Sequence, residues 1–175
     1  HLGAPAVASV ALFGCQVSRT HWPLKIPLVE WTGRLLLKRL GQVSGSRFKR
    51  GPEDEPAGVM IEAMRWNGLF GRFGEGKQDW WKGLAEVDLP LLAVSAAGDQ
   101  QDPDWACRKL FEQIGSEHRQ YLCLGRQQGF TDDFGHVEML VSKAAQAEVW
   151  PLVARWLKDS LTPLQGAPAE GAATV

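Results

Sequence analysis

Residues 89–95 read LPLLAVS, a short apolar run, and Gly98 and Asp99 follow it closely. A short apolar run bounded by turn residues is typical of a strand that is buried on both faces, as strands of parallel sheets are. Val7 to Phe13 (VASVALF) and Arg119 to Leu124 (RQYLCL) have the same character. Because helical segments separate these runs, the sequence predicts an α/β fold with a mostly parallel sheet and helices on both faces.

Two helical segments follow the predicted strands in the second half of the chain. Asp102-Pro103-Asp104 is typical of an N-cap, a first-turn proline and a first-turn acid, and the predicted helix ends at Gly115. The last helical region spans about Ser142 to Leu161 and carries one apolar stripe. Pro151 within it predicts a kink or a restart of the helix.

The segment between the first two strands is too long for a simple connection, and long insertions are usually functional. It contains predicted helices at about 24–40, 56–66 and 79–87, with a charged loop at 44–55 and a glycine-rich loop at 67–77. We interpret this segment as a helical cap. The predicted organisation is therefore a core strand segment at 1–18, a cap at 19–88, the rest of the core at 89–161 and a disordered tail at 162–175.

Composition excludes several classes of function. The 19 basic and 20 acidic residues are nearly balanced, which argues against a nucleic-acid-binding surface. Apolar runs stay shorter than the ~18–20 residues of a membrane span. Cys15, Cys107 and Cys123 are far apart and odd in number, so we expect buried free thiols, not a disulfide framework or a metal site. We expect neither a cofactor nor a metal, and a cytoplasmic location.

Two motifs resemble segments of the α/β-hydrolase superfamily, in particular its serine esterases and lipases. Residues 91–99 with Pro103 are similar to the segment in which a strand ends at the acid of the catalytic triad. Gly135-His136-Val137-Glu138 is similar to the family's Gly-His-x-Glu segment, which carries the triad histidine. The resemblance covers about Val7 to Leu161. It implies that this chain is the C-terminal half of such an enzyme with its helical cap, and that Asp99 and His136 are catalytic.

The triad chemistry needs a histidine that moves a proton and a carboxylate that orients it. Because the carboxyl ends of parallel strands meet at one edge of a sheet, Asp99 and the loop that bears His136 should lie close together. Each residue also has a plainer interpretation, since Asp99 can cap a turn and His136 can be a loop histidine. Asp102 is an alternative acid, although Pro103 behind it favours a helix cap. Glu138 is expected at a helix N-terminus or as an acceptor of loop N–H groups.

The nucleophile of the family is missing from the sequence. It stands in a Gly-x-Ser-x-Gly turn between a strand and a helix, and the chain contains no such segment. Cys15 follows a strand and Gly14, but Phe13 and Val17 stand where the flanking glycines belong. Ser44 and Ser46 lie in the charged loop. We therefore expect the nucleophile and the oxyanion hole to come from a missing N-terminal half, and we expect no hydrolase activity from this chain alone.

The resemblance implies hydrolysis of a carboxylic ester by the full-length protein, with a small apolar ester as substrate. Aromatic residues of the predicted cap either line the substrate site or pack the cap, and the sequence leaves both open: Trp22, Trp31, Trp66, Phe70, Phe73, Trp80 and Trp81. Other reactions of the same fold remain alternatives, namely thioester or amide hydrolysis, acyl transfer, and dehalogenation by an aspartate nucleophile. A different class of function is a non-catalytic fragment or pseudo-enzyme that acts as an interaction module.

Overall fold

The structure is a computed structural model, and it describes residues 7–17, 22–46 and 53–164. The chain divides into two compact units. One unit is Gln16–Leu84, and the other is formed by the segments on either side of it. Each unit is described by itself.

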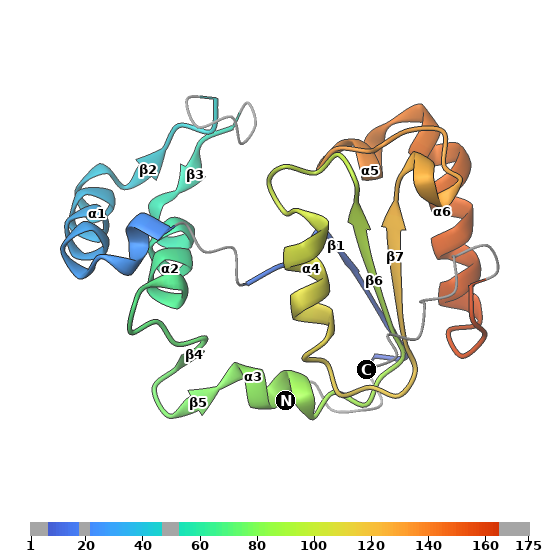
Figure 1. Cartoon of the computed structure of the whole chain (residues 1–175), viewed down its shortest axis with the longest axis horizontal. Helices are drawn as coiled ribbons and strands as arrows, with labels where there is room; N and C mark the ends of the chain where they lie inside the picture. The colour runs from blue at the N-terminus through green and yellow to red at the C-terminus, as the bar shows by residue number, and fades with distance from the viewer. Residues whose placement is uncertain (1–6, 18–21, 47–52, 165–175) are drawn as a thin grey trace. The chain divides into compact units, whose positions relative to one another are not determined.

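A three-stranded parallel sheet forms the centre of the outer unit (Figure 1). Its strands are β1 (Val10–Phe13), β6 (Leu91–Ala96) and β7 (Arg119–Leu124), in the order β1-β6-β7. Both pairings are parallel. The predicted parallel sheet is therefore confirmed, with β1 three residues shorter than predicted and β6 displaced toward its C-terminus.

Helices α4 (Asp104–Phe111) and α6 (Lys143–Lys158) cover opposite faces of this sheet (Figure 1). All residues of β6 are buried, which explains its continuous apolar run. Alternate residues of β6 and β7 pack with the apolar stripe of α6 in one core cluster, whose buried members on these three elements are Leu92, Val94, Ala96, Leu122, Leu124, Ala145, Val149, Val153 and Trp156. Burying each large side chain of this kind contributes about 1.5–3 kcal/mol.

The other face of the sheet carries a polar network that attaches α4 to the strands. The Asp104 carboxylate accepts hydrogen bonds from the buried Ser95 hydroxyl and from the Tyr121 hydroxyl, the latter at 2.9 Å. Burial raises the pKa of Asp104, but hydrogen bonds from Ser95, Tyr121 and Cys123 and the charge of Arg108 outweigh it, so the pKa lies below its ordinary value. The start of α4, and the loop before it, are thus tied to β6 and β7.

The last helical region begins earlier than predicted, with α5 (Glu138–Val141) ahead of α6. Ser142 separates the two helices and caps α6, because its hydroxyl accepts the Ala145 N–H at 3.0 Å. Helix α6 continues through Pro151, so the predicted restart at that residue is wrong. The expected disordered tail begins with three described residues, of which Leu164 donates its N–H to the Gln120 side chain at 2.8 Å. Residues 165–175 lie outside the described residues.

The inserted unit is built from short helices, as predicted. Two small antiparallel ladders were not predicted from the sequence: β2 (Gln42–Val43) with β3 (Glu55–Pro56), and β4 (Gly74–Glu75) with β5 (Gln78–Asp79). Each strand has only two residues, which is too short to show the alternation of apolar and polar residues by which a strand is predicted from sequence. The elements are a 3-10 helix (Trp22–Lys25), α1 (Pro27–Leu40), β2 (Gln42–Val43), β3 (Glu55–Pro56), α2 (Ala57–Asn67), β4 (Gly74–Glu75), β5 (Gln78–Asp79) and α3 (Trp80–Ala85).

Aromatic packing holds the middle of this unit together. Trp66, Phe73 and Trp80 meet edge to face, with ring centroids 5.1–5.8 Å apart, and Trp81 lies 4.9 Å from Phe73. Such pairs stabilise a core beyond the area that they bury. These four aromatics therefore have a packing role. Phe70, by contrast, is 85% exposed.

The cysteines meet the expectation only in part. All three are free, as predicted, and Cys107 is buried, but Cys123 is only partly buried and Cys15, which follows β1, is exposed. The prediction that every thiol is buried is wrong because the strand ends before Cys15. No helix within the described ranges is both long enough and apolar enough to cross a membrane.

Candidate active site

Asp99 lies in the turn that follows β6, at the carboxyl edge of the sheet. The turn is held in place at three points, because the N–H groups of Ala97, Gly98 and Asp99 donate to the carbonyls of Leu124, Phe134 and Ala96 at 2.9–3.1 Å. A side chain at Gly98 would come within 2.5 Å of the Asp133 carbonyl. Only glycine therefore lets the turn approach the loop that precedes His136 so closely.

The Asp99 carboxylate is fully buried and has a partner on each oxygen. Oδ1 accepts the N–H groups of Gln101 and Asp102 at 2.8 and 2.9 Å. Oδ2 lies 2.8 Å from Nδ1 of His136, and the Asp99 side chain is 0% exposed. The two amide groups fix the rotation of the carboxylate, so Oδ2 is aimed at the imidazole ring.

His136 sits on the loop between β7 and α5, and local hydrogen bonds shape this loop. The Asp133 carboxylate accepts the Arg126 N–H at 2.8 Å, and the Glu138 carboxylate accepts the Gly135 N–H at 3.0 Å. The second contact confirms that Glu138 serves loop N–H groups. Phe134, which is 2% exposed, anchors the loop in the core. These contacts place the imidazole of His136 at the edge of the sheet where Asp99 lies, as the parallel topology predicts.

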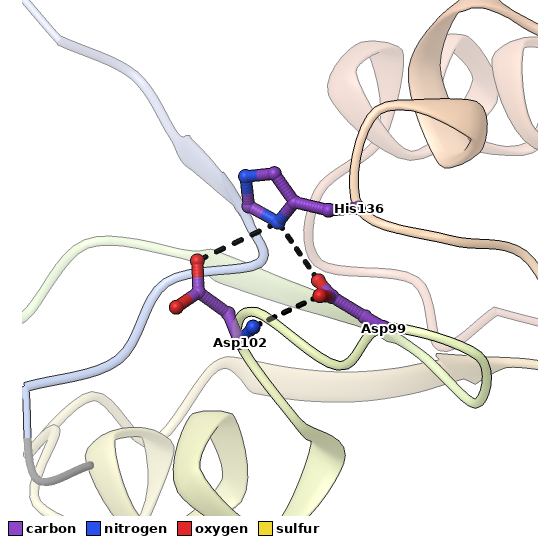
Figure 2. A group of neighbouring side chains, drawn as sticks. All are labelled: Asp99, Asp102 and His136. Atoms are coloured by element: carbon purple, nitrogen blue, oxygen red, sulfur yellow. Dashed lines mark hydrogen bonds and ion pairs between the residues drawn. The ribbon is translucent and has the colours of Figure 1, made fainter. Parts of the chain in front are cut away.

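For Asp102 the sequence favoured a helix cap and kept a second acid beside the histidine as the alternative, and the favoured interpretation is wrong. Pro103 occupies the N-cap position of α4 and makes no side-chain cap, so Asp102 does not cap the helix. Its carboxylate instead faces His136, with Oδ2 3.5 Å from Nδ1 (Figure 2). The Asp-Pro-Asp sequence suggested a cap because it equally fits a helix that begins one residue earlier, at Pro103, with Asp102 at the N-cap position. The observed helix begins at Asp104. Only the path of the turn reveals the second carboxylate beside the ring.

The three side chains form a compact group whose ligand atoms lie within 4.8 Å of one another. That spacing is small enough to surround a cation. Both oxygens of Asp99 already have N–H or ring-nitrogen partners, however, and Asp102 is the more exposed carboxylate, at 22%. This distribution of partners favours a carboxylate that holds an imidazole over a carboxylate that holds a metal.

The geometry defines what the imidazole can do. When Nδ1–H donates to Asp99, the neutral ring carries its lone pair on Nε2. Figure 2 shows Nε2 pointing away from both carboxylates, and the His136 side chain is 33% exposed. Nε2 is therefore free to take a proton from a group that approaches from outside, and the resulting imidazolium would lie against two negative charges.

The candidate nucleophiles do not join this group. Among the described residues, no serine, threonine or cysteine side chain makes a hydrogen bond with His136. The Cys15 thiol is directed to the Phe13 carbonyl. Desolvation and the charge of Asp102 raise the pKa of Cys15 against the lowering effect of that hydrogen bond, which keeps the thiol protonated. Ser44 and Ser46, in the other unit, bond to each other at 3.1 Å.

Comparison with known proteins identifies the fold. No family model and no curated protein matches the chain. Among solved structures, it is similar to a monoacylglycerol lipase from Paleococcus ferrophilus (TM-score 0.53, 12% identity), covering 88% of this chain and 60% of that one. It is also similar to a thermophilic esterase from Thermogutta terrifontis (TM-score 0.46, 16% identity), covering 89% of this chain and 57% of that one. The chain therefore has the α/β-hydrolase fold and spans about three fifths of the length of the lipase that it matches.

Proposed function

We propose that the full-length protein hydrolyses carboxylic esters by a serine-type mechanism, in which His136 is the general base and acid and Asp99 orients it. The observation that carries this proposal is the 2.8 Å contact between a fully buried carboxylate and Nδ1 of a histidine whose other nitrogen points outward. A buried carboxylate that accepts from Nδ1 fixes the tautomer that a general base needs.

The reaction divides into two proton transfers through Nε2. A serine, supplied by the N-terminal half outside these 175 residues, attacks the ester carbonyl while His136 takes the hydroxyl proton. The imidazolium then gives this proton to the departing alcohol, which leaves an acyl-enzyme. Water attacks the acyl-enzyme with the same base, and the products are a carboxylic acid and an alcohol. Asp99, and more weakly Asp102, stabilise the positive ring between these steps.

The inserted unit fits the role of a cap in this proposal. In the chain it is inserted between β1 and β6, the strand that leads into Asp99. Its aromatic residues Trp31 and Phe70 are 63% and 85% exposed, which leaves apolar surface outside its own core. We propose that residues 19–88 are the cap of the full-length enzyme and that this enzyme favours an apolar ester.

The test is mutation of the full-length protein. His136→Ala should lower kcat for p-nitrophenyl esters by about 10⁴-fold. His118→Ala is the matched control, because His118 is exposed and its side chain lies outside the site. A fluorophosphonate probe should label one serine, and the labelling rate should fall in the His136 variant. Unchanged ester turnover in His136→Ala would exclude the proposed role.

A further inference from the structure

One residue beside the imidazole has no place in the chemistry described so far. Gly14 directly follows β1 and has a left-handed backbone (φ +53°), a conformation that favours glycine. A Cβ built at this position would lie 3.1 Å from both Nδ1 and Cε1 of His136 and 3.3 Å from the Met139 methyl. A side chain at position 14 would thus press on the edge of the imidazole ring that faces Asp99.

The neighbours of Gly14 leave little room for adjustment. Its N–H donates to the Val94 carbonyl at 2.8 Å, which ties the residue to β6. Met139 is 1% exposed and belongs to the core cluster. The imidazole is the only one of the contacting groups with an open side, since it is 33% exposed. A side chain at position 14 would therefore be accommodated by displacing the ring toward solvent and away from Asp99.

We propose that Gly14 is a positioning residue for His136: the absence of a side chain creates the space in which the ring reaches Asp99 while Nε2 faces outward. The inference rests on the proposed function for its catalytic meaning. The contact itself is independent of that function. The segment after β1 thus contributes to the site because Gly14 has no side chain, and no side chain of β1 takes part in the proposed reaction.

Gly14→Ala in the full-length protein tests the proposal, with Gly129→Ala and Gly41→Ala as controls. Both control glycines have positive φ, +89° and +71°, but a Cβ at either would have no atom within 4 Å. All three variants carry left-handed strain, and only Gly14→Ala meets the ring. The proton on Nδ1, identified by its absence in His136→Ala, should be seen by NMR in the wild type and both controls. It should be lost or clearly shifted in Gly14→Ala.

A double-mutant cycle gives a second readout that needs no activity. Gly14→Ala should shift the unfolding equilibrium constant about fivefold more with His136 present than in a His136→Ala background, whereas Gly129→Ala should cost the same in both. If Gly14→Ala alone does not fold, recovery of folding in the double variant supports the contact. Turnover should fall roughly 10-fold or more in Gly14→Ala relative to the controls.

The outcomes separate the two proposals. An unchanged Nδ1 proton with no coupling in the cycle would overturn the role of Gly14. If the coupling is present but His136→Ala retains full turnover, Gly14 still positions the ring and the proposed catalytic function fails.

Discussion

Replacing Asp99 by asparagine is the sharpest perturbation of this site. The side chain keeps its shape, and its oxygen can still accept the N–H groups of Gln101 and Asp102. The amide nitrogen then faces Nδ1 of His136, where Oδ2 lay at 2.8 Å. Because an amide nitrogen only donates, Nδ1 must become the acceptor and the proton moves to Nε2. The imidazole then cannot take a proton from a nucleophile.

The expected loss follows from this change of tautomer. We expect kcat in Asp99→Asn to fall by about 10⁴-fold, which corresponds to about 5.4 kcal/mol of transition-state stabilisation. Asp102→Asn should cost only about fivefold, because its carboxylate is 3.5 Å from Nδ1 and 22% exposed, so solvent screens it. The double variant should be slower than Asp99→Asn, since Asp102 is the nearest carboxylate left to attract the Nδ1 proton.

The assay is hydrolysis of a p-nitrophenyl ester by the full-length protein, with thermal unfolding to show that each variant is folded. Asp102→Asn serves as the matched control because it makes the same chemical change on the other carboxylate. If Asp102→Asn reduced kcat as much as Asp99→Asn, or more, the assignment of Asp99 as the orienting acid would be refuted.

Three other predictions concern stability and thiol chemistry. The pKa of Asp104 is lowered in the folded protein, so its carboxylate contributes stability above pH 3.8, and this contribution is lost as the pH falls toward the folded-state pKa. The difference in unfolding free energy between wild type and Asp104→Asn, measured by urea unfolding, should therefore shrink below pH 3.8. Alkylation followed by mass spectrometry should modify the exposed Cys15 before Cys107, because Cys107 is buried and burial raises its pKa to about 12. Leu92→Ala should cost about 2–5 kcal/mol of unfolding free energy, while Leu157→Ala, at a position 51% exposed, should cost far less; equal losses would contradict the described core.

Parts of this architecture could be predicted from sequence because they depend on local physics. The apolar run before Asp99 indicates a strand buried on both faces, and the observed strand is completely buried. The Arg119–Leu124 strand was predicted with its observed bounds. The resemblance to α/β-hydrolase segments singled out Asp99 and His136, and the topology predicted that they lie close together, since parallel strands end at one edge of a sheet. Glu138 was predicted as an acceptor for loop N–H groups, and it accepts the Gly135 N–H.

Other features depended on where the chain goes after each element ends. Asp102 was interpreted as a helix cap, and it lies beside the imidazole because α4 starts after Pro103. The short ladders of the inserted unit are two residues per strand, which is too short for any periodic signal.

The sequence by itself determined the class of fold, the edge of the sheet at which the polar residues gather, and the two residue types that meet there. The class of fold and the edge follow from hydrophobic periodicity and turn chemistry, which act over a few neighbouring residues. The two residue types are what the resemblance to the α/β-hydrolase superfamily implied. Only the tertiary structure revealed that a second carboxylate faces the ring and that Gly14 leaves the space that the ring fills. Both depend on contacts between residues more than 30 positions apart in the chain, and no local pattern encodes how closely such residues approach one another.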